Sequence, residues 1–189
     1  MRELLGWSFV CLFAGFTLLS AEPARAQQQD GKVLVSSSLI SDVNSIQAGQ
    51  KFRIGVLYRI EPGWHIYWKN PGDAGIPTKI AWQLPEGFKV HDLQWPIPTR
   101  QKEPGDLEVF AYSSEVLLFA EVEAPQSLRN EPIEIQAKSD WLVCENFCIP
   151  GSAQLSLRMN TGVNASSQSG RIFEKYAARL PETGSVASL

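Results

Sequence analysis

The stretch SDWLVCENFCIPG, residues 139–151, carries the two residues of this sequence with the greatest capacity for chemistry. Cys144 and Cys148 are separated by three residues and lie between an apolar run and a Pro-Gly turn. Such a pair can form a structural disulfide, contribute two ligands to a metal site, or act as a reactive dithiol. The remaining sequence has to distinguish among these three roles.

The N-terminal residues 1–26 have the pattern of a secretory signal peptide. Arg2 precedes an apolar stretch at 4–19, and an Ala-x-Ala sequence ends at Ala26. The apolar stretch is shorter than the ~20 residues that a membrane-spanning helix needs. Cleavage after Ala26 removes Cys11, so that of 3 cysteines two (3 − 1) remain. We expect an exported protein, in a compartment where this remaining pair can be oxidised.

Composition indicates one ordinary domain. The 189 residues are 44% hydrophobic and 20% charged, and the formal net charge is −3. Basic residues do not cluster, so the sequence predicts no nucleic-acid partner. We assign no cofactor.

Segments with alternating apolar residues dominate the rest of the chain. In residues 51–60, Phe52, Ile54, Val56, Tyr58 and Ile60 share one face. The segments with the same alternation or a similar apolar content are 33–35, 64–68, 79–84, 88–90, 116–123, 133–138 and 153–159. Pro- and Gly-rich turns separate them. Short strands at this spacing predict an all-β fold, an antiparallel β-sandwich.

One C-terminal segment has a different period. In residues 171–180, Ile172, Tyr176 and Leu180 recur at every fourth position, which predicts a short helix, docked or mobile. We therefore expect a signal peptide at 1–26, a sandwich domain at 27–160, and a linker, helix and tail at 161–189.

Other chemistries find little support. A structural zinc site needs four ligands, usually in two close pairs, and nothing in the sequence places His65 or His91 beside the cysteines. We therefore assign no metal ligands, although a Cu(I) site made by two thiolates stays open. No G-x-S-x-G motif is present, so hydrolysis by an activated serine is not supported.

The aromatic segment GWHIYWKNPGDAGIP, residues 63–77, is dense in large rings. On a strand, Trp64 and Trp68 would share one face and Tyr67 would lie on the other. We expect both faces to be covered, either by the core and a loop or by a partner.

The spacing of the cysteines favours a redox pair over a passive bridge. A disulfide needs Cα atoms within about 4.4–6.8 Å, whereas an extended strand would hold residues four apart at ~13 Å, so CENFC must turn back. So short a loop contributes only ~2 kcal/mol in the chain-entropy model. Asp140 and Glu145 disfavour a strongly acidic thiol, which suits a passive electron carrier.

Several stretches resemble the N-terminal periplasmic domain of DsbD-type thiol:disulfide interchange proteins, including the ScsB-like copper-tolerance branch. They are residues 63–77, 93–98 (LQWPIP), 110–122 (FAYSSEVLLFAEV) and 139–157 (SDWLVCENFCIPGSAQLSL). They run in the family's order and cover most of the chain after residue 26.

This resemblance implies an immunoglobulin-like sandwich that acts as a protein-disulfide reductase component in the periplasm. Electrons would come from a membrane-embedded thiol–disulfide donor and pass to periplasmic thioredoxin-like or disulfide isomerase-like proteins. By position, Cys144 and Cys148 would be the redox pair, with Cys148 forming the mixed disulfide. Phe110 would lie in a cap loop that shields the cysteines, with Tyr112 as the alternative.

Two departures from the family pattern accompany the resemblance. The best-known branch separates its cysteines by more than three residues. The family's membrane domain and thioredoxin-like domain have no counterpart in these 189 residues, so the donor would be a separate protein or the chain a truncated product. Two other functions stay open: a binding module with a structural disulfide, and a Cu(I)-binding protein.

Overall fold

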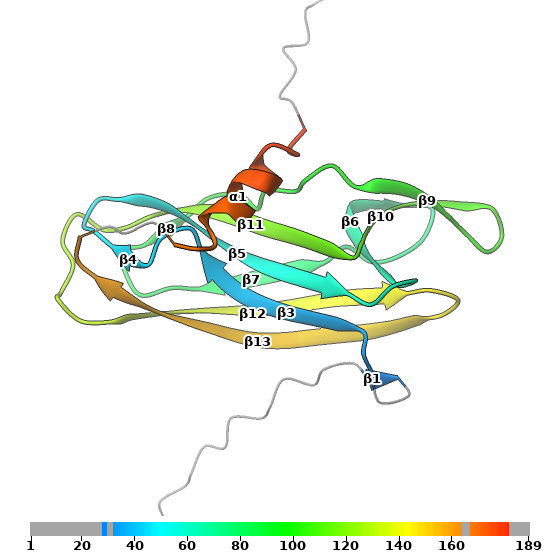
Figure 1. Ribbon diagram of the computed structural model, residues 1–189, viewed down its shortest axis with the longest axis horizontal. Coiled ribbons are helices and arrows are strands. Elements are labelled where there is room, and N and C mark those ends of the chain that lie inside the picture. The colour runs from blue at the N-terminus through cyan, green and yellow to red at the C-terminus, as the bar shows by residue number, and fades with distance from the viewer. Residues whose placement is uncertain (1–27, 30–31, 164–166, 182–189) are drawn as a thin grey trace, which may run out of the picture.

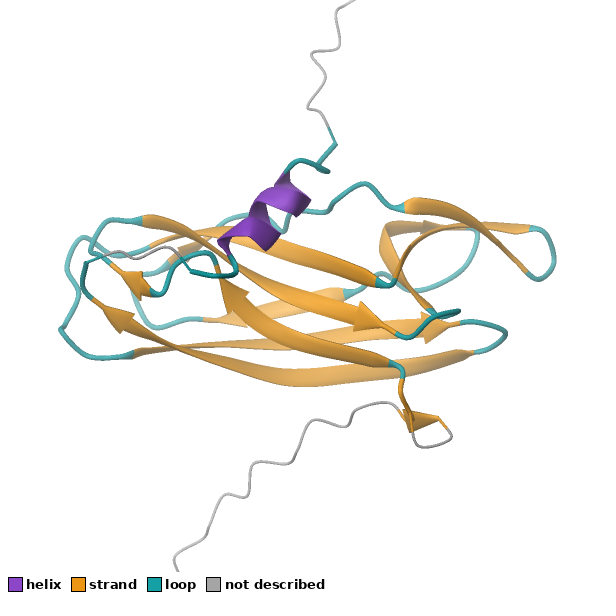
Figure 2. Cartoon of the chain, in the orientation of Figure 1, coloured by secondary structure: helices purple, strands orange, loops and turns teal. Residues whose placement is uncertain are grey.

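The computed structural model describes residues 28–29, 32–163 and 167–181. The expected signal peptide lies outside these residues. Two β-sheets face each other, and in Figure 1 β3, β5 and β11 lie over the long strands β12 and β13. Figure 2 shows how little of the described chain is helical. The predicted all-β sandwich with one short C-terminal helix is confirmed.

The thirteen strands and one helix of the described chain follow one another in this order: β1 (Gln28–Gln29), β2 (Lys32–Val33), β3 (Val35–Ser41), β4 (Ser45–Ile46), β5 (Lys51–Ile60), β6 (His65–Gly72), β7 (Lys79–Gln83), β8 (Lys89–Val90), β9 (Thr99–Glu103), β10 (Leu107–Ser113), β11 (Glu115–Glu123), β12 (Ile133–Cys144), β13 (Cys148–Thr161) and α1 (Gly170–Ala177). One sheet has the order β4-β13-β12-β6-β10-β9, with β7 also paired to β12, and the other has the order β3-β5-β11-β8. β1 and β2 pair only with each other.

The edge of β12 opposite β13 is shared by two partners. β7 pairs with β12 between Gln136 and Asp140, and β6 then pairs with its last residues, Val143 and Cys144. β6 continues the sheet through β10 to β9. The end of β12 is therefore joined laterally to strands from the middle of the sequence.

Alternation along the strands forms the core between the two sheets. In β12, Ile133, Ile135 and Ala137 are buried and alternate with exposed residues. From β5, the predicted apolar face is buried throughout, with Ile54 and Val56 fully inaccessible. Because successive side chains of a strand point to opposite faces, the apolar residues of each strand face the core together.

Helix α1 covers the outer face of the second sheet, so the helix is docked. Phe173 and Tyr176 are buried, and the Phe173 ring meets Phe119 edge-to-face with centroids 5.8 Å apart. The Arg53 guanidinium lies 5.3 Å from the centroid of the Phe173 ring. Leu57, whose neighbours on β5 face the core, is also buried.

A buried hydrogen bond links the two sheets. The hydroxyls of Tyr58 in β5 and Ser139 in β12 lie 2.5 Å apart, and both residues are fully inaccessible. Burial raises the pKa of Tyr58, so its hydroxyl stays protonated at neutral pH. Each hydroxyl satisfies the other in a place that water does not reach.

We expect Tyr58→Phe to lower the free energy of unfolding by about 1–3 kcal/mol, because it leaves the Ser139 hydroxyl buried without this partner. Tyr58→Phe with Ser139→Ala should recover most of the loss, since removing both polar groups is nearly neutral. Urea denaturation of the oxidised protein measures both. A double variant that is less stable than the single one would contradict this account.

Within the described residues, no helix is long and apolar enough to cross a membrane.

Candidate functional site

The cysteines close the end of the β12–β13 hairpin. The two strands pair without interruption from Ile133 opposite Met159 to Cys144 opposite Cys148. Residues 145–147 make the turn, and the sulfur atoms are bonded at 2.03 Å with the Cα atoms 4.2 Å apart. The predicted reversal of the chain within CENFC is confirmed.

The two sulfur-bearing residues have different access to solvent. Cys144 is 1% exposed, whereas Cys148, the first residue of β13, is exposed. Neighbouring strands explain this difference: Cys144 lies between β13 and β6 and packs with buried residues of β6 and β10, whereas Cys148 is paired only with β12. A protein partner would therefore reach Cys148 first.

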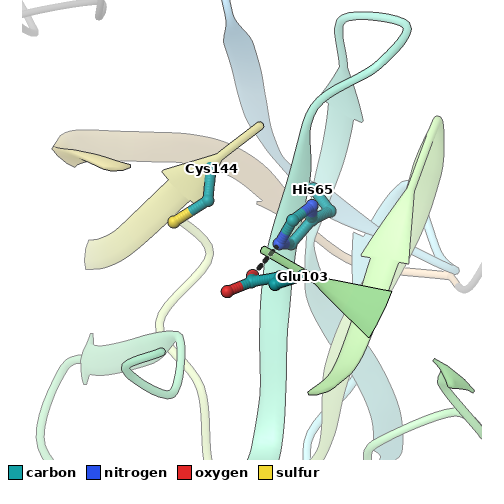
Figure 3. A group of neighbouring side chains, drawn as sticks. All are labelled: His65, Glu103 and Cys144. Carbon is teal, nitrogen blue, oxygen red and sulfur yellow. Dashed lines mark hydrogen bonds and ion pairs between the residues drawn. The ribbon is translucent and has the colours of Figure 1, made fainter. Parts of the chain in front are cut away.

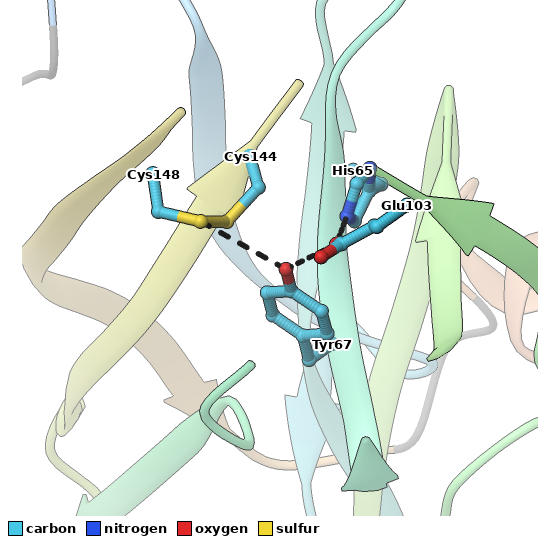
Figure 4. Close-up of a disulfide and its surroundings, with 5 residues drawn as sticks. All are labelled: His65, Tyr67, Glu103, Cys144 and Cys148. Atoms are coloured by element: carbon cyan, nitrogen blue, oxygen red, sulfur yellow. Dashed lines mark hydrogen bonds and ion pairs between the residues drawn. A yellow bond between two sulfur atoms is a disulfide. The ribbon is translucent and has the colours of Figure 1, made fainter. Parts of the chain in front are cut away.

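Strand β6 supplies the side chains beside the disulfide. His65 pairs with Cys144 across the sheet, and Tyr67, two residues on, points its hydroxyl at the disulfide, 3.9 Å from Cys148 Sγ (Figure 4). The period of two places His65 and Tyr67 on the same face. Their rings meet edge-to-face with centroids 5.1 Å apart.

Glu103, the last residue of β9, joins this group. Its Oε1 lies 2.8 Å from His65 Nε2 and accepts a hydrogen bond of 2.5 Å from the Tyr67 hydroxyl (Figure 4). The side chains of His65 and Glu103 are only 7% and 13% exposed. Burial, and next the Glu103 carboxylate, raise the pKa of Tyr67. The phenol therefore stays protonated and donates its one proton to Glu103, while its oxygen lies near Cys148 Sγ.

A small apolar cluster surrounds the inner side of the disulfide. Val109 and Ala111 of β10 pack with Tyr67 and Cys144, and all four are essentially inaccessible. Gly75 lies against the Tyr67 ring: an added Cβ would be 2.3 Å from Tyr67 Cε1. The loop after β6 therefore fixes the ring that faces the disulfide.

The turn of residues 145–147 is exposed and carries one large apolar side chain. Phe147, 48% exposed, stacks edge-to-face on Trp64 with centroids 5.4 Å apart. Glu145 lies over Gly63, where an added Cβ would come within 2.5 Å of its Oε1. The turn of residues 61–63 and Trp64 thus pack against the cysteine loop.

The structure places the two predicted cap residues elsewhere on β10. Phe110 stacks edge-to-face on Trp68, and the buried Tyr112 donates its hydroxyl to Pro96 O at 2.6 Å. Both lie on the face of β10 opposite to Val109 and Ala111, the face that packs with Cys144. A shielding role for Phe110 or Tyr112 stays a prediction.

His65 and Glu103 are not among the site residues predicted from the sequence. No sequence pattern placed His65 beside the cysteines, and the structure corrects this: a ring nitrogen of His65, a Glu103 carboxylate oxygen and Cys144 Sγ lie within 4.8 Å of one another (Figure 3). Alternation could have put His65 on the same face as Tyr67. Glu103 had no comparable signal in the sequence.

Comparison with known proteins gives a matching family and a solved structure of similar fold. The N-terminal periplasmic domain of ScsB from Proteus mirabilis is 20% identical, with a TM-score of 0.62 over 86% of this chain and 61% of that chain. This chain therefore spans about three fifths of that domain's length. The reduced N-terminal domain of DsbD from Neisseria meningitidis is 13% identical, with a TM-score of 0.34 over 69% of this chain and 91% of that chain. No curated protein matches the sequence significantly.

The likeness to the ScsB domain supports the predicted immunoglobulin-like sandwich at the level of the fold. The sequence match identifies a family. Residues 32–160 match the family described as thiol:disulfide interchange protein DsbD, N-terminal. That segment is well over half of the 189 residues and includes both cysteines of the disulfide. This chain belongs to the family of DsbD N-terminal domains.

Proposed function

We propose that this chain is a periplasmic thiol–disulfide carrier that passes reducing equivalents through Cys144 and Cys148. One observation carries the proposal: an exposed residue, Cys148, is disulfide-bonded to a buried one, Cys144, within a domain of the DsbD family. The donor would be a membrane-embedded thiol–disulfide protein. The acceptors would be periplasmic thioredoxin-like or disulfide isomerase-like proteins.

The reaction runs through a mixed disulfide. The reduced Cys148 thiolate attacks one sulfur of the acceptor's disulfide, that bond breaks, and the leaving thiolate takes up a proton. Cys144 then loses its proton and attacks Cys148 Sγ. The Cys144–Cys148 bond forms and the acceptor's second thiol is released. Two electrons and two protons have then moved to the acceptor.

The surroundings of the pair suit this exchange. The Tyr67 hydroxyl lies 3.9 Å from Cys148 Sγ; it donates its one proton to Glu103 in the oxidised protein and would have to turn from Glu103 to donate to the thiolate. Access for a partner comes from the exposed turn, where Phe147 offers an apolar contact next to Cys148. The buried Cys144 attacks only the neighbouring sulfur, which limits it to the resolving step.

The reduction potential of the pair tests the proposal. Equilibration in glutathione buffers should give a midpoint well above about −300 mV, the upper range of structural disulfides. The reduced protein should also reduce one disulfide of an oxidised thioredoxin-like substrate per molecule. A Cys144→Ser, Cys148→Ser double variant is the control, with circular dichroism to confirm its fold.

The competing function is a binding module with a structural disulfide. In that case the midpoint would lie below about −300 mV and no substrate would be reduced. Either result would contradict the proposed carrier function.

A further inference from the structure

Four side chains with different metal-binding atoms meet at the disulfide. A ring nitrogen of His65, a Glu103 carboxylate oxygen and Cys144 Sγ lie within 4.8 Å of one another, and Cys148 Sγ is bonded to Cys144 Sγ at 2.03 Å. Figure 3 shows the histidine, the carboxylate and the first sulfur converging from separate strands. In the oxidised protein the two sulfur atoms are bonded to each other and are not available as thiolate ligands. Reduction would free both as ligands.

We propose that the reduced protein binds one zinc-class divalent cation through Cys144, Cys148, His65 and Glu103. Two thiolates, one imidazole and one carboxylate are the donor types that Zn²⁺ takes in four-coordinate tetrahedral sites. Magnesium and calcium need oxygen ligands throughout, so the sulfur and nitrogen atoms select against them. A carboxylate is a poor ligand for soft Cu(I), and it is the Glu103 oxygen that separates a zinc-class site from a Cu(I) pair of thiolates.

The fold holds these donors where a metal could use them. His65 begins β6, Glu103 ends β9, and the cysteines flank the hairpin turn, all within one continuous sheet. The Tyr67 hydroxyl donates to Glu103 at 2.5 Å, which is the kind of outer hydrogen bond that orients a ligating carboxylate. The buried pair Val109 and Ala111 gives the inner side a dry wall.

The charges of the donors also suit a divalent cation. Two thiolates and the Glu103 carboxylate would bring three negative charges to the +2 ion and leave the site with a net charge of −1. In the described residues a second cluster, His91 with Glu121 and Glu123, also has three donors, but it is partly exposed and the Lys51 ammonium already bonds both carboxylates. That cluster is therefore a useful control rather than a competing site.

Metal binding would depend on the redox state. A dithiol reductant gives two electrons and two protons to the Cys144–Cys148 bond and becomes a disulfide. The two thiols then release their protons to solvent as the cation binds. The inference needs only that the bond be reducible, which a chemical reductant achieves whether or not the protein is a carrier.

Cobalt titration tests the site directly. The purified protein is reduced with a phosphine, freed of reductant without oxygen, and titrated with Co²⁺. One equivalent should bind with the visible absorption of tetrahedral cobalt and a thiolate-to-cobalt charge-transfer band, and Zn²⁺ should displace it. The oxidised protein should show neither band.

Variants separate this four-ligand site from a pair of cysteines. His65→Gln and Glu103→Gln should each weaken metal binding by about 100-fold or more. Loss of a residue that only orients a ligand costs about 10–100-fold, and loss of a ligand itself should cost at least as much. The matched control His91→Gln should bind as the wild type does. Circular dichroism and the melting temperature of the oxidised forms establish that each variant is folded, and Glu103→Gln preserves the shape of the side chain.

Three results would overturn the site. They are absence of tetrahedral cobalt from the reduced wild type, wild-type affinity in His65→Gln and Glu103→Gln, and binding of Cu(I) alone by the two thiolates without dependence on His65 or Glu103. None of them bears on the reduction potential or on disulfide exchange. Failure of the metal site and failure of the carrier function are therefore distinguishable.

Discussion

Replacement of Cys144 by serine is expected to trap Cys148 in stable mixed disulfides with oxidised thioredoxin-like proteins. The variant keeps the exposed sulfur that attacks, but it lacks the neighbour that completes the exchange. Cys148→Ser should trap at least about tenfold less, because the remaining Cys144 is 1% exposed and access limits the rate of thiol attack. Non-reducing electrophoresis after acid quenching, with mass spectrometry of the adducts, measures the trapped fraction.

The pair of single variants is its own control, since each retains one cysteine of the disulfide. Equal trapping by the two would contradict the assignment of Cys148 as the attacking sulfur. Absence of adducts from both would contradict exchange through this pair. Melting temperatures of the two variants should be similar, because both lose the same short cross-link.

Gly75→Ala is expected to lower the free energy of unfolding by about 4 kcal/mol. Gly75 has φ +96°, a conformation that residues with a side chain rarely adopt, and an added Cβ would lie 2.3 Å from Tyr67 Cε1. The backbone and the buried ring must both move. Urea denaturation of the oxidised protein measures the loss, and faster reduction of the disulfide by a phosphine would report displacement of the Tyr67 ring.

Gly105→Ala is the matched control for this substitution. Gly105 has φ +91°, but the nearest atom to an added Cβ is Leu107 Cγ at 4.0 Å. Its loss should be about 1–2 kcal/mol, the cost of the backbone conformation alone. The difference between the two variants then measures the contact with Tyr67. Similar losses would show that the ring can move aside freely.

Much of the fold could be predicted because strand and helix periods depend on neighbours in sequence. The alternation in residues 51–60 and 133–138 indicated buried faces that β5 and β12 indeed present to the core. The same rule placed Tyr67 opposite Trp64 and Trp68, and the structure puts Tyr67 in a separate cluster from them. It did not predict that Leu57 would also be buried, because the pattern of one strand does not record what covers its outer face.

The sequence by itself determined that two cysteines lie at a tight reversal of the chain, since the distance needed for a disulfide excludes an extended segment. Only the tertiary structure decided what surrounds them. β6 and β9 reach the cysteines through lateral hydrogen bonding in one sheet, so His65 and Glu103 meet Cys144 from positions far away in sequence. Pairing between distant strands depends on the burial of whole faces, which no local pattern records. It is this pairing that sets a histidine, a tyrosine and a carboxylate around the disulfide.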